Sequence, residues 1–439
     1  MTNHASHQFG PADFNSDSLG EPSHKSPISN RIGFFVPENS RVLIENSAEK
    51  IFSICKSGVA PLSFEQAGPR EKIYFNPEEI NCGIVSCGGL CPGINDVIRS
   101  ITLTLSRSYG VRNIYGFRYG YQGISNDRHE PYLLTPEFVD GIHEEGGSIL
   151  CTSRGPREPE EMISVLKHYG VKILFTIGGD GTLSGAYRLG QEIIRQNLDI
   201  AVIGIPKTID NDLLWVERTF GFTTAVDEAW GAITAAHVEA SCVWNGVGVV
   251  RLMGRESGFI AAHASLAHSD VDFCLIPEVP FSLEGQNGLL KHLQRRLEKS
   301  HHAVIVIAEG AGQEFFSMKQ KADASGNIIF NDIGIYLCHC IKKYFQEQNI
   351  PVGLKYIDPS YLIRSLPANA FDSEFCMVLG QHATHAGMAG KTNLVIGHWN
   401  GHFVHVPLPL IAGKRKQLDP DGHTWNRVLE ATGQPSFMV

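Results

Sequence analysis

The sequence predicts an α/β fold made of two doubly wound, Rossmann-like domains with mainly parallel sheets and an N-terminal extension. First, short and almost continuously apolar runs recur from about residue 82, as in strands that are buried on both faces. Second, segments with helical spacing separate these runs, which is typical of βαβ units. Third, the residues directly after the runs are polar or glycine-rich, as expected where ligands bind at the carboxyl ends of parallel strands. The runs are 82–87, 171–177, 201–205, 246–253, 272–276 and 303–309.

Composition narrows the class of protein. The 439 residues are enough for two or three domains. The net charge of −9 excludes a general attraction to nucleic acid or to an acidic membrane surface. No apolar run approaches the roughly 18 residues of a membrane helix. The ten cysteines are scattered, without C-x-x-C pairs or the density of a disulfide scaffold, which indicates a cytoplasmic protein.

The elements divide the chain into consecutive parts. Residues 1–30 are polar and rich in Ser, Asn and Pro, which predicts a disordered tail without a signal peptide. Residues 95–110 have helical spacing, with Asn95 placed to cap the helix and Gly110 to end it. Asn400-Gly401 lies between two β-like runs and predicts a hairpin. The remaining boundaries are an N-terminal extension over 31–80, a first domain over 81–220 completed by part of 380–439, a second domain over 221–380, and a C-terminal segment with the hairpin over 381–439.

The glycines that follow the run 82–87, in "GGLCPGIN", allow two interpretations. Gly88 and Gly89 either serve close packing between a strand and a helix, or let backbone N–H groups face a phosphate. Their spacing is not the G-x-G-x-x-G dinucleotide fingerprint.

The turn "GGDGT" after the run 171–177 is a stronger signal. Gly179 and Gly181 permit close approach to a ligand, and Thr182 is placed to cap the next helix. A phosphate-binding turn would normally exclude a carboxylate, but Asp180 is acceptable if Mg²⁺ stands between it and the phosphates. The alternative is an Asx turn in which Asp180 bonds its own backbone.

"PKTIDND" places two acids, Asp210 and Asp212, behind the buried run 201–205. In phosphoryl transfer to an alcohol, a carboxylate accepts the hydroxyl proton while cations hold the transferred group. Lys207 and Arg255 are candidates for those cations. The alternative is a capped loop whose charged side chains are only solvated. It is less favoured because the residues after the other predicted strands are equally polar.

The histidines do not predict a zinc site. His398, His402 and His405 straddle the predicted hairpin, and His382 and His385 lie three apart in a helix-like segment. No cysteine or acid is placed to complete a tetrahedral shell.

Together these motifs resemble the phosphofructokinase family. The series occurs in the family's order over roughly residues 82–400, and "AGPREKIYF" (67–75) is similar to the long ATP-dependent forms of plants and trypanosomatids. The motifs are "GGLCPGIN", "TSRG" (152–155), "GGDGT", "PKTIDND", "TFGFTTAV" (219–226), "MGRESGFIA" (253–261), "IPE" (276–278), "AEG" (308–310) and "YLIR" (361–364).

The resemblance implies transfer of a phosphoryl group to the C1 hydroxyl of fructose 6-phosphate. Asp210 would be the general base, with Arg255 and Lys207 as catalytic cations, and Asp180 would bind Mg²⁺. The implied donor-binding residues are Gly88, Arg154, Gly155, Gly179, Asp180, Gly181 and Thr182. The implied sugar-binding residues are Thr208, Ile209, Asp210, Met253, Gly254, Arg255, Glu309, Tyr361, Leu362, Ile363 and Arg364, with Tyr361 and Arg364 on the 6-phosphate.

The family uses either ATP or pyrophosphate as donor. In pyrophosphate-dependent members the corresponding motif resembles "GGDD", with a carboxylate at the position of Gly181. That carboxylate would repel an α-phosphate, so Gly181 favours ATP. Lys207 favours pyrophosphate, although the long ATP-dependent forms combine Gly and Lys in this way. The expectation is an ATP-dependent 6-phosphofructokinase of glycolysis, acting on fructose 6-phosphate as a homodimer or homotetramer. The alternatives are a diphosphate-dependent enzyme, another kinase with "GGDGT", and a catalytically silent regulatory subunit.

Overall fold

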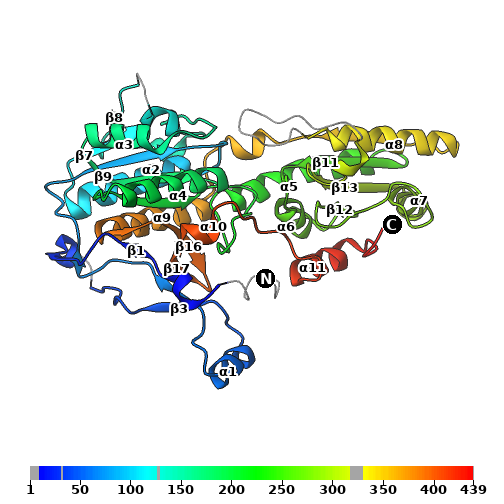
Figure 1. The fold of residues 1–439 in the computed structure, drawn as a ribbon. Helices are drawn as coiled ribbons and strands as arrows, with labels where there is room; N and C mark the ends of the chain where they lie inside the picture. Colours follow the sequence, from blue (N-terminus) through cyan, green and yellow to red (C-terminus); the bar gives the residue numbers. More distant parts are fainter. Residues whose placement is uncertain (1–8, 31–32, 126–128, 317–329, 439) are drawn as a thin grey trace.

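The computed structural model describes residues 9–30, 33–125, 129–316 and 330–438, and it contains two α/β units side by side (Figure 1). Each unit is a twisted sheet with helices on both faces, as the apolar runs predicted. Each of the six predicted runs coincides with a strand to within two residues. The expected fold class is therefore confirmed.

The first sheet has nine strands within the described residues, and its centre is parallel. Strands β16, β10, β9, β6 and β7 are neighbours in that order and run parallel, while the outer strands are antiparallel. In spatial order the strands are β3 (Arg41–Leu43), β4 (Ser63–Gln66), β17 (His402–Pro407), β16 (Leu394–Trp399), β10 (Ala201–Pro206), β9 (Val171–Gly178), β6 (Asn81–Ser86), β7 (Asn113–Phe117) and β8 (Tyr132–Leu133).

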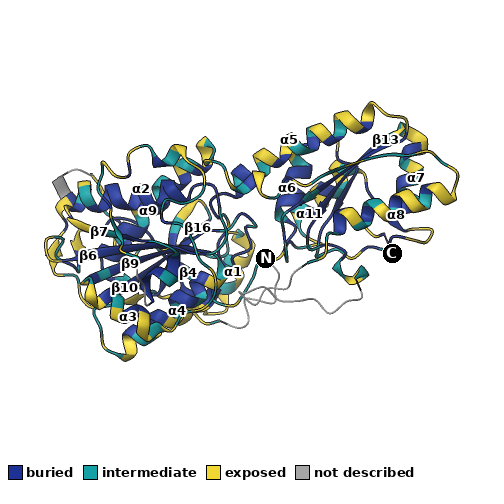
Figure 2. Cartoon of the chain, turned by 90° about the horizontal axis from the view of Figure 1, so that it is seen from above, coloured by how far each residue is buried: buried dark blue, intermediate teal, exposed yellow. Residues whose placement is uncertain are grey.

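Helices cover both faces of the first sheet (Figure 2). One face carries α2 (Ile94–Leu103), continued by the wider turns of η3 (Thr104–Tyr109), together with α9 (Ala370–Met388). The other face carries α3 (Pro159–His168) and α4 (Asp180–Arg195). Gly110, in a left-handed conformation, ends the first of these helices as predicted. The predicted cap is wrong: Gly93 is the N-cap, and the Asn95 side chain instead bonds the 145–149 loop.

The second sheet contains four parallel strands in the order β12-β13-β11-β14 within the described residues. These strands are β11 (Gly246–Leu252), β12 (Phe273–Leu275), β13 (His302–Ala308) and β14 (Gly353–Ile357). The helices around them are α5 (Phe222–Ser241), α6 (Phe259–Ala267), α7 (Leu289–Ser300), α8 (Ile333–Glu347) and α11 (His423–Thr432).

The chain passes between the two units more than once. It leaves the first unit through α5 and returns through α9, so the predicted boundary at 380 falls inside a helix that packs on α2. After the β16–β17 hairpin, whose turn at Asn400-Gly401 is confirmed, α10 (Leu408–Ile411) leads into the segment 412–418. That segment crosses back to α11 and the second unit (Figure 1). One buried apolar core continues from α2 and α9 through α5 to α6.

The N-terminal residues differ from the predicted tail. Residues 1–8 lie outside the described part of the chain, but residues 9–30 pack against the first unit. Phe14 in η1 (Pro11–Phe14) is fully buried against Phe64 and Trp215. The prediction of a disordered tail is thus wrong for residues 9–30. Further short elements of this region are β1 (Asp17–Ser18), β2 (His24–Lys25), α1 (Ala48–Lys56) and β5 (Lys72–Ile73), and β1 pairs with β15 (Lys391–Thr392).

Buried charges join the predicted 31–80 extension, described from residue 33, to the hairpin. The Glu65 carboxylate lies 2.9 Å from Lys391 Nζ, 3.0 Å from an Arg70 nitrogen and 3.4 Å from His405 Nδ1. Burial alone would raise the pKa of Glu65, but His405 and Lys391 hold it well below its usual range. His405 thus belongs to a buried ion cluster. Among the described residues, no helix has the length and apolarity to cross a membrane.

Candidate active site

The carboxyl ends of strands from both sheets open into one cavity of about 800 Å³. It is lined by the turns after β6, β9 and β10 from the first unit and by residues at the ends of β11 and β13 from the second. Sixteen of the predicted site residues line it: Gly88, Arg154, Gly155, Gly179, Asp180, Gly181, Thr182, Lys207, Thr208, Ile209, Asp210, Met253, Arg255, Glu309, Tyr361 and Arg364.

Three predicted site residues do not line this cavity. Gly254 instead holds the backbone of its turn: its carbonyl accepts a bond from Gly310 N, and a Cβ there would lie 2.5 Å from the Ser257 carbonyl oxygen. Leu362 is 74% exposed and Ile363 is buried in the core. Both belong to the short turn η7 (Leu362–Arg364) that carries Arg364.

The turn "GGDGT" forms the start of α4 at the cavity wall. The helix begins at Asp180 with Gly179 as its N-cap, so the predicted capping role of Thr182 is wrong. Thr182 is instead packed beneath Gly178, where a Cβ would approach it to 2.2 Å. A Cβ at Gly181 would meet no described atom within 4 Å, so this position faces open space. The start of a helix also presents N–H groups and a positive dipole end that suit an anion.

Asp180 is held by the segment 412–418. One carboxylate oxygen accepts bonds from Gly413 N at 3.0 Å and from Ser184 Oγ at 3.5 Å. The other lies 3.8 Å from Arg415 Nε, while another Arg415 nitrogen lies 3.0 Å from Glu256 of the second unit. Arg415 therefore contacts acids from both units at the edge of the cavity.

The donor set around Asp180 fits Mg²⁺ shared with a substrate. Among the described residues, no three acids, histidines or cysteines are grouped to hold a metal alone. Mg²⁺ is usually held by one or two carboxylates plus substrate phosphate oxygens, so a single acid beside an open, glycine-lined wall is the expected protein contribution.

Lys207 reaches from the end of β10 to the glycine turn after β6. Its side chain is buried, and Nζ donates to the Gly89 carbonyl at 2.7 Å. Burial lowers the pKa of this ammonium. Its charge therefore lies beside Gly88 and Gly89, which also line the cavity.

Asp210 has the environment of a general base. Its Oδ1 is buried and has no hydrogen-bond partner within the described part of the chain. Burial first, and then the negative charge of Asp212, raise the pKa of Asp210. By contrast, Asp212 accepts a bond from Thr208 Oγ1 at 3.1 Å. Asn211 between them has a left-handed backbone, and its side chain bonds Glu217 and Thr219, which fixes the loop.

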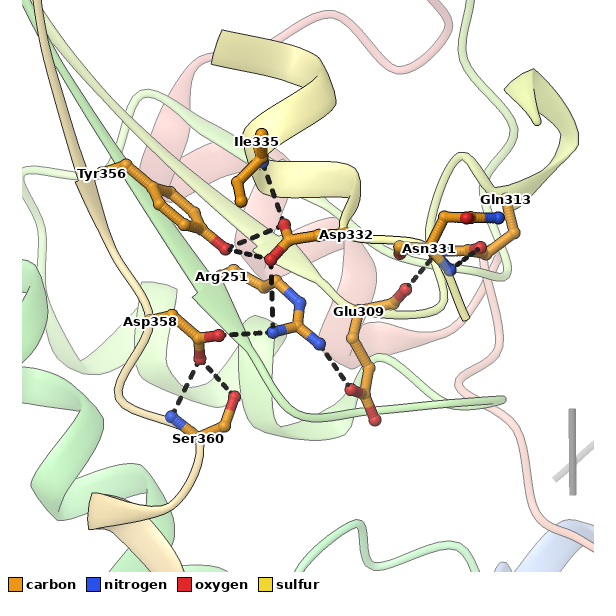
Figure 3. A network of polar contacts seen from close by, with 9 residues as sticks. All are labelled: Arg251, Glu309, Gln313, Asn331, Asp332, Ile335, Tyr356, Asp358 and Ser360. Atoms are coloured by element: carbon orange, nitrogen blue, oxygen red, sulfur yellow. Dashed lines mark hydrogen bonds and ion pairs between the residues drawn. The ribbon is translucent and has the colours of Figure 1, made fainter. Parts of the chain in front are cut away.

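Glu309 and the segment 358–364 form another part of the cavity wall, and Arg251 links them (Figure 3). Burial raises the pKa of Glu309, while Arg251 and other arginines oppose that rise. The Arg364 guanidinium lies 4.8 Å from the Tyr361 ring centroid. This part of the wall therefore combines one buried acid with cationic and aromatic groups. It also reaches the glycine turn after β6, because a Cβ at Gly89 would lie 3.5 Å from an Arg364 nitrogen.

Sequence reasoning missed several cavity residues. Arg251 was detectable, because it is a charged residue inside an apolar run and two positions before Met253. Arg415 had no such signal, because only tertiary packing brings the 412–418 segment to Asp180. The other missed lining residues include Tyr121, Arg157, Arg188, Asp358 and Ser360.

Two of the histidines for which a zinc site was considered, His382 and His385, are packed in the core of the first unit. His382 stacks on Phe403 with ring centroids 4.7 Å apart, and His385 bonds the Tyr109 hydroxyl. Burial lowers the pKa of His382 to about 3 and that of His385 to about 4, so both rings are neutral near pH 7.

Comparison with known proteins gives consistent matches. A family profile described as phosphofructokinase matches residues 81–387. The chain is 48% identical to the ATP-dependent 6-phosphofructokinase of Borreliella burgdorferi, covering 97% of this chain and 98% of that protein. It is 46% identical to the protein of the same name from Trypanosoma cruzi, covering 88% and 79%. A solved pyrophosphate-dependent phosphofructokinase from Marinobacter aquaeolei shares the fold, with a TM-score of 0.65 and 22% identity over 80% of this chain and 91% of that one.

Proposed function

Because the chain belongs to the phosphofructokinase family, we propose that it is an ATP-dependent 6-phosphofructokinase. It transfers the γ-phosphoryl group of ATP to the C1 hydroxyl of fructose 6-phosphate and gives fructose 1,6-bisphosphate in glycolysis. The observation that carries the proposal is the unpartnered, buried Oδ1 of Asp210, in a cavity that also contains Asp180, Arg255 and Glu309. A carboxylate oxygen that no described group satisfies is available to a substrate hydroxyl.

Asp210 acts as the general base in this proposal. A base works best when its pKa lies near the working pH, and burial beside Asp212 raises the pKa of Asp210 in that direction. Asp210 takes the C1 hydroxyl proton as the bond to phosphorus forms. Asp212 keeps its bond from Thr208 and supports the loop.

The donor phosphates lie against the glycine turns after β6 and β9. Arg154, the N-terminus of α4 and the buried Lys207 supply positive groups there, and Arg255 stabilises charge on the transferred group. Asp180 would hold Mg²⁺, which would supply positive charge to neutralise the donor phosphates.

The choice of ATP rests on Gly181. The open space at its Cβ position leaves room for an α-phosphate and its nucleoside. Lys207 does not discriminate between the donors, because its ammonium lies at the Gly89 turn, where phosphates of either donor can reach it. The relatives at 46–48% identity are named as ATP-dependent, which supports the same choice.

The sugar lies against Glu309 and the segment 358–364, next to the donor phosphates. Glu309 accepts bonds from sugar hydroxyls, and Arg364 with Tyr361 binds the 6-phosphate, where a guanidinium matches phosphate oxygens. Thr208, Ile209 and Met253 also line the cavity and complete the sugar site. Oligomerisation as a homodimer or homotetramer and residence in the cytoplasm remain part of the proposal, the former testable by light scattering.

The test is a donor assay on the purified chain. Fructose 6-phosphate is supplied with Mg²⁺ and either ATP or pyrophosphate, and fructose 1,6-bisphosphate is measured. We expect product with ATP and little with pyrophosphate. If product forms with pyrophosphate and not with ATP, the chain is a diphosphate-dependent phosphofructokinase instead. If product forms with neither donor, the proposed phosphofructokinase activity is refuted.

A further inference from the structure

Arg251 lies at the cavity end of β11 and is surrounded by three acids (Figure 3). One of its terminal nitrogens lies 2.9 Å from Glu309, and the other lies 2.5 Å from Asp358 and 3.9 Å from Asp332. The side chain is only 15% exposed, so these ion pairs are screened by little water. None of the site motifs assigns a function to this arginine.

The two close partners belong to different parts of the proposed sugar site. Glu309 follows β13 and is the acid proposed for the sugar hydroxyls. Asp358 begins the segment 358–364, and its Oδ1 accepts bonds from the Ser360 N–H at 3.0 Å and from the Ser360 hydroxyl. The same segment carries Tyr361 and Arg364, proposed for the 6-phosphate.

The third acid, Asp332, has partners of its own. It caps α8 by accepting from Ile335 N at 2.9 Å, and it accepts from the Tyr356 hydroxyl at 2.9 Å. Its distance to Arg251 is also the longest of the three. Arg251 is therefore bonded chiefly to Glu309 and Asp358.

We propose that Arg251 is a positioning residue for the sugar phosphate, holding Glu309 and the segment 358–364 at a fixed separation. The proposal rests on the proposed function, because it assigns hydroxyl binding to Glu309 and phosphate binding to Arg364. Its two terminal nitrogens reach two acids in different directions, which the planar guanidinium fork allows and a single ammonium does not.

Charge supports the same role. Without Arg251, the Glu309 and Asp358 carboxylates would repel each other in a site that receives an anionic substrate. Like charges placed together in a partly buried site are costly. Arg251 thus both spaces the two acids and reduces the negative charge that the 6-phosphate meets.

The test compares Arg251→Met, Arg251→Lys and a matched control, Arg296→Met. Arg296 also pairs with a buried acid of the second unit, at 2.7 Å from Asp272, but it does not line the cavity. We measure kcat and KM for each substrate, and binding of fructose 6-phosphate alone by calorimetry.

Arg251→Met is expected to raise the KM for fructose 6-phosphate by about 30-fold, the size seen when one partner of a buried charge pair is removed. The calorimetric Kd rises in parallel, while kcat and the KM for ATP stay within about 3-fold, the pattern of lost ground-state binding. Arg251→Lys, which keeps the charge and loses the fork, falls between Arg251→Met and wild type. Arg296→Met matches wild type.

Two results would overturn the inference. An unchanged KM for fructose 6-phosphate in Arg251→Met would show that the sugar site does not depend on this arginine. A fall in kcat together with a rise of similar size in the KM for both substrates would show that Arg251 has only a general structural role. Failure of the proposed function is a separate result, because the wild-type chain itself would then form no fructose 1,6-bisphosphate.

Discussion

A carboxylate placed at Gly181 should exclude ATP from the donor site. The substitution Gly181→Asp is structurally permitted, because a Cβ there meets nothing within 4 Å among the described atoms. Gly181 lies in the first turn of α4, where an acid interacts favourably with the helix dipole and loss of glycine favours the helix. The variant should therefore unfold at the same temperature as wild type, or slightly higher.

The magnitude follows from Coulomb's law. Two unit negative charges about 5 Å apart repel by about 3 kcal/mol at an effective dielectric constant near 20. If that repulsion acts on the bound α-phosphate, kcat/KM for ATP falls roughly 150-fold. Pyrophosphate has no third phosphate to meet the new carboxylate, so any activity with it should fall less.

The assay measures kcat/KM for both donors at saturating fructose 6-phosphate. Gly181→Asn is the control, because it adds nearly the same volume without the charge. We expect Gly181→Asn to lose much less ATP activity than Gly181→Asp. Equal losses in the two variants would show that volume acts at this position instead of charge, and retention of full ATP activity by Gly181→Asp would refute the location of the α-phosphate.

Three further predictions concern the base, its neighbour and the N-terminal segment. Asp210→Asn should lower kcat by roughly 10²- to 10⁴-fold in steady-state kinetics, because it removes the proton acceptor, and should leave the KM for fructose 6-phosphate nearly unchanged. If kcat falls little in Asp210→Asn and strongly in Asp212→Asn, then Asp212 is the general base. In wild type, activity should decline as the pH falls through the raised pKa of Asp210, since the base works only when ionised. Asp212→Asn removes the neighbouring negative charge, so the acid limb of its pH profile should move to lower pH, and an unmoved limb would exclude coupling between the two acids. Phe14→Ala should destabilise the fold by about 3–5 kcal/mol in denaturant unfolding, because it removes a fully buried ring; a loss below about 1 kcal/mol would mean that residues 9–30 contribute little to stability.

Elements that depend on local sequence were predictable. Strands such as β9 and β13 follow from apolar runs because their burial on both faces leaves few polar positions. The hairpin at Asn400-Gly401 follows because few residues adopt its backbone conformation. The position of the cavity was predictable from the polar turns after the strands, since parallel strands bring distant turns to one edge of a sheet.

Features that depend on distant contacts were not predictable in this way. Phe14 lies in a polar segment, and its burial depends on Phe64 and Trp215, which are far away in the sequence. Arg415 reaches Asp180 only because the chain crosses between the units at 412–418. Thr182 and Asn95 resembled caps, but glycines are the N-caps of both helices. The Asn95 side chain bonds the 145–149 loop instead, and Thr182 packs beneath Gly178.

The apolar core that continues from α2 and α9 through α5 to α6 limits how the chain can be divided. A fragment that ends at residue 220 would lack α9 and strands β16 and β17, and would expose the apolar faces that they cover to water. A fragment that begins there would keep α9 but lose α2 and β10, against which α9 packs. We therefore expect that neither half folds on its own when the chain is cut at residue 220, because each would expose apolar surface that the other covers.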